Sequence, residues 1–185
     1  MKTPTPSRRK RKREQTASHL SATAFRLFEA NGYETVTMEQ IAQEADVAKA
    51  TLYNYFPVKE ALIAHRFHED ISEGMALRAS SLSAYSDFES RMRYLLNESA
   101  VWHSERRVYL PHYLRFLTSC ANETHDKARI ESGDNPGQHI LTAMFEAAQR
   151  SGEVTKRHTA EEMAKNFEYL LWAAVTAWLH DPSKS

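Results

Sequence analysis

The chain has 185 residues, of which 42% are apolar and 26% are charged, and its formal net charge is zero. This is enough apolar material for a substantial core, in one long domain or two small ones. The single Cys120 excludes a disulfide within one chain and fits a reducing compartment. No apolar run approaches the roughly 18 residues needed to span a bilayer, and no signal peptide is visible. We therefore expect a cytoplasmic protein without a membrane partner.

The charges are unevenly distributed along the chain. Residues 1–13 contain seven basic residues and no acid, which leaves 17 basic residues against 24 acids elsewhere. The run RRKRKR follows Thr3-Pro4-Thr5-Pro6, so we expect 1–13 to be a disordered basic arm. Such a run could equally be a nuclear-import signal or adhere to anionic lipid. Because a DNA-reading motif follows it, we favour contact with DNA, as in arms that reach the minor groove.

The first helix is expected from about Arg13 to Ala30. Asn31-Gly32 is a typical C-terminal stop, because Gly32 can adopt the left-handed conformation. Its apolar residues recur at spacings of three and four, which predicts one buried face made of Ala17, Leu20, Ala24, Leu27 and Phe28.

Residues 37–56 have the pattern of a helix-turn-helix. Thr37 and Gln40 are spaced as a capping box, which predicts the start of a short helix. The turn is expected at Asp46-Val47, with Asp46 left-handed, since aspartate tolerates positive φ better than most residues. Leu52 and Phe56, four residues apart, predict the inner face of the second helix. In such motifs the second helix enters the DNA major groove.

Beyond this pattern, the segment Ala24–Leu62 resembles the DNA-binding domain of TetR-type transcriptional regulators. The resemblance implies an all-α fold, with a helix-turn-helix domain at 14–74 and a helical ligand-binding and dimerisation domain at 75–185. It also implies a sequence-specific DNA-binding regulator, a repressor by family default, that a small-molecule effector releases from a double-stranded operator. The matching positions are Asn31-Gly32-Tyr33, Thr37, Ile41-Ala42, Ala45, Val47, Thr51-Leu52-Tyr53, Phe56 and Lys59-Glu60-Ala61-Leu62.

The predicted DNA contacts combine the arm with the second helix of the motif. Lys49 is the candidate for reading guanine, whereas Tyr53 and Lys59 match family positions that contact phosphate and set register. Residues 14–74 hold ten acids and four bases, so the arm must supply much of the attraction. The complete predicted set is Arg8, Arg9, Arg11, Arg13, Thr37, Lys49, Ala50, Thr51, Tyr53, Asn54, Tyr55 and Lys59.

The remaining sequence predicts further helices by periodicity alone. We expect a fourth helix opened by Pro57 and continuing to about Gly74. The next helices are expected at about 85–104 and 107–121, and Pro111 either opens or kinks the second of them. A loop is expected at 122–137 and a helix at 138–150. The last helix is expected to start at a second capping box, Thr159 with Glu162, and to end at Pro182.

Two apolar groups in this half have either a functional or a purely structural interpretation. Trp102, Tyr109, Tyr113 and Phe116 could line an effector cavity, although aromatic stripes are more often core. The last two helices could complete the monomer core or form a homodimer interface, which we favour because residues 170–175 are apolar nearly all round. The predicted dimer residues are Phe145, Phe167, Leu170, Leu171, Ala174 and Trp178.

No enzyme, cofactor or metal is predicted. His65, His68 and Glu69 could hold a metal but lack a further ligand at a recognisable spacing, and Cys120 with His125 is no better as a nucleophile and base. Two alternative classes stay open. One is a non-specific binder of nucleic acid or anionic surfaces that uses the basic arm, and the other is a helical enzyme without a recognisable motif.

Overall fold

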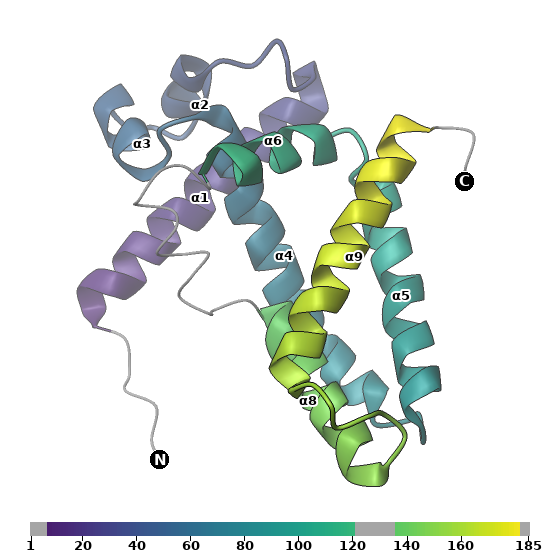
Figure 1. Ribbon diagram of the computed structural model, residues 1–185. Coiled ribbons are helices and arrows are strands. Elements are labelled where there is room, and N and C mark those ends of the chain that lie inside the picture. Colours follow the sequence, from purple (N-terminus) through teal and green to yellow (C-terminus); the bar gives the residue numbers. More distant parts are fainter. Residues whose placement is uncertain (1–6, 121–135, 182–185) are drawn as a thin grey trace. The chain divides into compact units, whose positions relative to one another are not determined.

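The computed structural model describes residues 7–120 and 136–181, with the side chains of 75–79, 120 and 136 left out. Within these residues there are only helices and no strands, which confirms the all-α class (Figure 1). The helices are α1 (Arg8–Asn31), α2 (Met38–Glu44), α3 (Lys49–Tyr55), α4 (Lys59–Leu82), α5 (Phe88–Glu105), α6 (Leu110–Cys120), α8 (Pro136–Ser151) and α9 (Ala160–His180). None of them is long and apolar enough to cross a membrane, among the residues described.

The helices pack as two units. The first contains the residues up to Glu69 together with His112–Leu117, and the second contains Asp70–Pro111 and the chain from Thr118 onward. The predicted boundary lies after Gly74, whereas the first unit here ends at Glu69. In addition, six residues of α6 belong to the first unit. Helices α4 and α6 each belong partly to both units.

One face of α1 is buried in the core of the first unit, as the spacing of its apolar residues predicted. Leu20, Ala24 and Phe28 are buried, whereas Leu27 is only half-buried. The core also contains Ile41 of α2 and four fully buried side chains of α3 and α4, which are Leu52, Leu62, Ile63 and Phe67.

The helix-turn-helix has the predicted geometry. Thr37 Oγ1 accepts from the Gln40 N–H at 3.2 Å, and Gln40 Oε1 accepts from the Thr37 N–H at 2.8 Å, so the capping box is complete. Asp46 has φ 54°, and no other non-glycine residue among those described has a positive φ. Its N–H donates to Gln43 O and the Val47 N–H to Ala42 O, which is a Schellman turn.

The basic arm is the main departure from expectation. Residues 1–6 lie outside the description, but Arg8–Arg13 form the first turns of α1 rather than a disordered segment. The Ser7 hydroxyl accepts from the Lys10 N–H and caps the helix, and Lys10 pairs with Glu14 one turn later. Arginine and lysine are good helix formers, so a capped basic run joined to a stable helix extends it.

Several helix boundaries also differ from those predicted. Helix α4 begins at Lys59, two residues after Pro57, and continues to Leu82. Helix α5 begins at Phe88 because the Asp87 carboxylate accepts from the Ser90 N–H. Pro111 stands at the opening of α6, where a missing N–H costs little, so it does not kink the helix. Helix α8 starts at Pro136, and the rest of the predicted 122–137 loop, with His125, lies outside the description.

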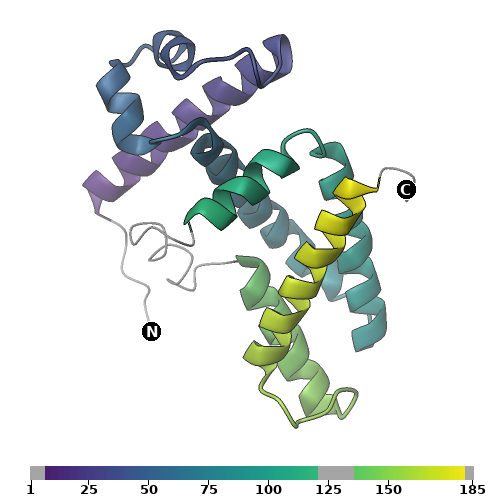
Figure 2. The same ribbon diagram turned by 45° about the horizontal axis from the view of Figure 1, so that its top comes forward.

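The second unit contains a helical hairpin of α8 and α9 (Figures 1 and 2). The predicted capping box starts α9, since Thr159 and Glu162 exchange hydrogen bonds at 2.9 and 3.1 Å. A buried cluster of Leu141, Phe145, Ala160 and Ala164 joins the two helices. Phe88 of α5 packs on this cluster, with its ring 5.1 Å from that of Phe145.

Candidate DNA interface and effector cavity

The outer face of α3 presents polar and aromatic side chains to solvent. Ala50, Tyr53 and Asn54 are exposed, and Thr51 and Tyr55 are half-buried. The opposite face is anchored, because Leu52 is fully buried and Phe56, just after the helix, is 3% exposed. This short helix therefore holds its polar groups on a fixed backbone rather than on a loop.

Lys49, at the start of α3, is engaged by Glu39 of α2. The Lys49 ammonium forms an ion pair with the Glu39 carboxylate and lies 5.9 Å from the centre of the Tyr53 ring. The hydrogen bond between the two groups lowers the pKa of Glu39 and raises the pKa of Lys49. Glu39 was not among the predicted site residues, although its position in the first turn of α2 is visible in the sequence.

The helical basic segment reaches the same part of the first unit. Arg13 lies over the Tyr55 ring, 5.8 Å from its centre, so the end of the basic run and α3 are neighbours. The side chains of Arg8, Arg9, Arg11 and Arg13 are all exposed. The structure thus brings together two groups of predicted contacts that are about forty residues apart in sequence.

Lys59, which we predicted to contact phosphate, makes two hydrogen bonds within the first unit. Its ammonium donates to Tyr33 O at 2.7 Å and to Val36 O at 2.9 Å, and it lies 4.1 Å from the centre of the Tyr33 ring. Two of its three N–H groups are therefore used inside the first unit. Lys59 therefore holds the segment that leads into Thr37 and α2 by two of its backbone carbonyls.

The same segment carries the contacts of α6 with the first unit. The ring centres of His112 and Tyr33 are 3.9 Å apart, and Arg115 pairs with Glu60 of α4. Burial raises the pKa of Tyr33 and lowers the pKa of His112. Tyr33, shortly before the helix-turn-helix, therefore contacts both His112 and Lys59.

A cavity of about 130 Å³ lies inside the second unit. Its walls are mostly apolar and come from α4, α5, α8 and α9. Two carboxylates, of Glu98 and Glu168, also line it. Its other lining residues are Ile71, Leu95, Leu96, Ser99, Trp102, His103, Gly137, Leu141, Phe167, Leu171 and Trp172.

His103 is the buried polar group of this cavity. It is 8% exposed, and its ring packs against Trp102 and Trp172 with centres 5.0 and 5.6 Å away. His103 Nδ1 lies 2.6 Å from Ser99 O, one turn earlier on α5. On the opposite edge, Nε2 is buried and has no hydrogen-bond partner among the described residues. Burial lowers the pKa of His103, which keeps the ring neutral.

Of the four aromatic residues predicted to line an effector cavity, Trp102 lines the cavity beside His103. Tyr113 instead packs on Phe67 of the first unit, with ring centres 5.1 Å apart. Tyr109 and Phe116 are half-buried and are absent from the cavity wall. Trp102, Tyr113 and Phe116 lie on helices, as predicted, whereas Tyr109 lies in the turn before α6. Periodicity could not tell which unit each face of α6 would join.

The predicted dimer residues are divided between core and surface. Phe145 is 6% exposed and belongs to the α8–α9 cluster, so it is not available to a partner. Phe167 and Leu171 line the cavity, and Arg107 covers the Trp178 ring at 4.5 Å. Leu170 and Ala174 are exposed. They lie on a surface of α9 that also shows Tyr169, Ala173 and Ala177.

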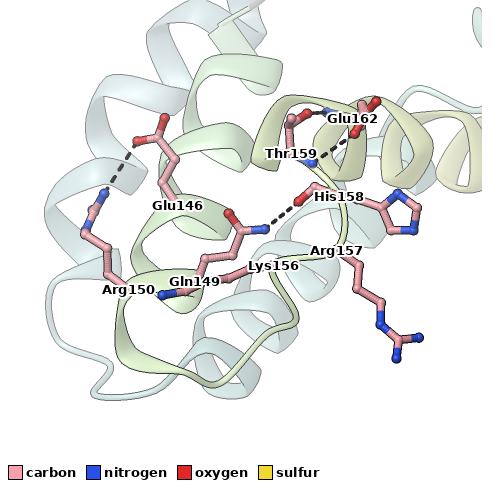
Figure 3. Close-up of a pocket in the computed structure, with 8 residues that line it drawn as sticks. All are labelled: Glu146, Gln149, Arg150, Lys156, Arg157, His158, Thr159 and Glu162. Carbon is pink, nitrogen blue, oxygen red and sulfur yellow. Dashed lines mark hydrogen bonds and ion pairs between the residues drawn. The ribbon is translucent and has the colours of Figure 1, made fainter.

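A second, open depression of about 440 Å³ lies where α8 turns into α9 (Figure 3). Its walls are polar, and several of its side chains are already paired. Gln149 donates to His158 O, Arg150 pairs with Glu146, and Thr159 bonds Glu162. It therefore has neither the apolar wall nor the unpaired buried group of the cavity beside His103.

The described residues offer no metal centre, since no three His, Cys, Asp or Glu side chains gather there. His65 lies 3.4 Å from Glu69, one turn away on α4, and both side chains are mostly buried. The Cys120 side chain and His125 lie outside the description, so their pairing is not described.

Comparison with known proteins agrees with this geometry. Residues 20–65, which span α1 to the start of α4, match the family described as bacterial regulatory proteins, tetR family. This segment, which contains the helix-turn-helix, is therefore similar to the DNA-binding domain of TetR-family regulators. Over 59 residues it is 39% identical to a candidate mycofactocin biosynthesis transcriptional regulator of Mycobacterium tuberculosis. That match covers 32% of this chain and only 30% of the relative.

The rest of the chain is matched by fold. FadR of Thermus thermophilus, a TetR-family transcriptional repressor solved with lauroyl-CoA, superposes with a TM-score of 0.69. The match covers 91% of this chain and 86% of that one, at 20% identity. FadR of Bacillus subtilis, solved with stearoyl-CoA, gives 0.62 over 91% and 89%, at 18% identity. The N-terminal helix-turn-helix and the C-terminal helical domain are therefore the shared fold.

Proposed function

We propose that this chain is a transcriptional repressor that binds a specific operator as a homodimer and leaves it when a small molecule binds. The observation that carries the proposal is the α2–α3 motif, whose left-handed Asp46 turn holds α3 with its polar face exposed. Lys49, Tyr53 and Asn54 lie on that face and would reach the major groove. The exposed Arg8 to Arg13 turns of α1 would add phosphate contacts, as a rigid helix rather than a flexible arm.

Because residues 14–74 carry more acids than bases, the contributions of the basic turns of α1 and of Lys49 to DNA binding can be tested separately. Replacing Arg8, Arg9 and Arg11 by Gln keeps the helix and removes charge, so binding to all DNA should weaken and the salt dependence should become less steep. Each lost phosphate contact removes about 0.9 from the slope of log K against log salt. Lys49→Ala should instead weaken binding about 5- to 150-fold for one base pair while changing the slope little. Lys156→Ala, at an exposed lysine of the second unit, is the matched control.

A homodimer would cover the exposed apolar side of α9. Tyr169 is 66% and Leu170 70% exposed, beside three exposed alanines that allow close helix approach. An apolar helix side of this kind is usually covered by a partner. Leu170→Arg should convert the dimer to monomer in analytical ultracentrifugation. Val108→Arg is the control, because Val108 is also 70% exposed and lies in the same unit. A monomeric wild type would contradict this part of the proposal.

The effector would occupy the cavity beside His103. Ile71, in its wall, belongs to α4, and α4 continues without a break back to Lys59, which holds the segment before the helix-turn-helix. A ligand that displaces Ile71 therefore acts on the helix that anchors the DNA-reading motif. It can do so only through different affinities for the bound and free states. Operator DNA must then weaken effector binding by the same factor by which effector weakens DNA binding.

The two FadR relatives were solved with acyl-CoA molecules, and acyl-CoA is one effector class to test. The cavity here favours a ligand that is smaller and carries less negative charge than an acyl-CoA. Its described wall contains Glu98 and Glu168 but neither Lys nor Arg, whereas an acyl-CoA carries several phosphate charges. We therefore expect lauroyl-CoA to leave the DNA complex intact. Release by lauroyl-CoA at concentrations near those of the protein would overturn that expectation.

The direct test of the proposed function is binding to sites selected from random duplex DNA. A repressor of this kind should enrich one two-fold-symmetric sequence and keep it in excess unrelated DNA. Binding that unrelated DNA abolishes would favour the alternative, a non-specific polyanion binder that relies on Arg8–Arg13.

A further inference from the structure

We infer that the cavity beside His103 selects a one-ring-sized apolar ligand that bears a hydrogen-bond donor, such as a phenol or an indole, and that His103 Nε2 accepts that hydrogen bond. The inference rests on the proposed function only in calling the ligand an effector. The ligand chemistry itself follows from the contacts of the imidazole.

The first step is the proton position on His103. A carbonyl oxygen can only accept, so the 2.6 Å contact between Nδ1 and Ser99 O requires the hydrogen to be on Nδ1. In the neutral ring, Nε2 then has a lone pair and no hydrogen. Because the whole contact lies within one turn of α5, the backbone of that helix fixes the tautomer.

The second step is that Nε2 is buried without a partner. The residue is 8% exposed, and no described group donates to this atom. A buried acceptor without a hydrogen bond is costly, so a molecule that supplies a donor there removes the cost and gains the bond. The neighbouring rings of Trp102 and Trp172 cover the imidazole, which leaves the cavity as the place for such a donor.

The third step is size and polarity. An apolar cavity of about 150 Å³ holds a benzene molecule, and this one measures about 130 Å³. A single ring therefore fits without rearrangement of the wall. Besides His103, Ser99 and the two indoles of Trp102 and Trp172, the polar residues of the wall are Glu98 and Glu168. Their two carboxylates disfavour an anionic ligand. An anion would also meet the lone pair of Nε2 rather than a donor.

The probes that test this inference are p-cresol, 4-methylanisole and p-toluate. The first carries a donor, the second replaces it by an ether that only accepts, and the third is an anion with a similar ring. Binding to the full-length protein without DNA is measured by calorimetry and by tryptophan fluorescence, since Trp102 and Trp172 line the cavity. We expect p-cresol to bind about tenfold more tightly than 4-methylanisole, which corresponds to about 1.4 kcal/mol. We expect p-toluate to bind more weakly than either of them.

Variants at His103 locate the preference. His103→Leu removes both ring nitrogens and keeps the site apolar, so the preference for p-cresol over 4-methylanisole should vanish. His103→Phe keeps the ring shape and should give the same result by a different route. His158→Gln replaces an exposed histidine of the same unit and should change nothing. Near-ultraviolet circular dichroism checks that each variant is folded.

The outcomes separate this inference from the proposed function. Equal binding of p-cresol and 4-methylanisole to wild type, or a preference that survives in both variants, would overturn the inference while leaving DNA binding untouched. Failure of all three probes to bind would also overturn it, and would mean that ordered water or packing alone explains Nε2. Binding with the expected preference, but without any effect on an operator complex, would confirm the ligand chemistry and count against effector release.

Discussion

Replacing Asp46 by Gly should leave the stability of the first unit unchanged or raise it by up to about 1 kcal/mol. Asp46 has φ 54° and closes the Schellman turn between α2 and α3. The left-handed conformation costs an L-residue about 1–2 kcal/mol, less for aspartate, and glycine adopts it freely. Glycine also loses about 0.5–1 kcal/mol through the entropy of the unfolded chain. The two effects oppose each other, which limits the gain.

Asp46→Ala gives the comparison that isolates the backbone effect. Alanine has no polar group to support the left-handed conformation, so this variant should be about 1–2 kcal/mol less stable than Asp46→Gly. Asp46→Asn removes only the charge and should resemble wild type, because asparagine also tolerates positive φ. The assay is urea unfolding followed by far-ultraviolet circular dichroism, with all four proteins in one buffer. A glycine variant that is less stable than the alanine variant would refute the reasoning.

Three further predictions concern electrostatics and buried contacts. Lys59→Met should destabilise the first unit by about 1–3 kcal/mol, because Tyr33 O and Val36 O each lose a charged donor. The control Lys156→Met should leave stability unchanged, and the midpoints of urea unfolding measure both variants. Glu39→Gln should raise affinity for specific and unrelated DNA alike, since it frees Lys49 and removes a negative charge beside α3, and an unchanged affinity in fluorescence anisotropy would contradict this. Wild type should lose stability as the pH falls below about 6.5, because burial lowers the folded-state pKa of His103 and the unfolded chain takes up its proton first. His103→Phe should lose less between pH 7.5 and 5.5, and an equal loss would count against His103 as a source.

The local features of the helix-turn-helix were predictable from sequence because they depend on neighbours in the chain. The capping box at Thr37 and the left-handed Asp46 each need only residues within one turn. The buried pair Leu52 and Phe56 follows from helical spacing. The helical start of α1 differs from the disordered arm that the basic run after Thr3-Pro4-Thr5-Pro6 predicts, because Ser7 supplies a cap and Glu14 offsets part of the charge.

The effector cavity could not be predicted from sequence because it depends on which faces meet in three dimensions. Trp102 and His103 are adjacent in the chain, and periodicity indicated only the tryptophan. In the structure, His103 points one ring nitrogen at Ser99 O and buries the other. This arrangement depends on the rotamer of His103 and on the neighbouring Trp172 of α9. The exposed side of α9 was equally hidden, since a helix that is apolar nearly all round does not show which side its own unit covers.

The most direct test of the account is the sequence and spacing of the DNA that the protein selects. Two recognition helices related by a two-fold axis should enter successive major grooves, about 34–36 Å apart. Selection from random duplexes should therefore give inverted half-sites whose centres are separated by about 10 base pairs or a multiple of a helical turn. Lys49→Ala should relax the preference at one position in each half-site. Selection that yields no enriched sequence, or a preference that Lys49→Ala and replacements at Tyr53 and Asn54 leave unchanged, would contradict the assignment of α3 as the reading helix.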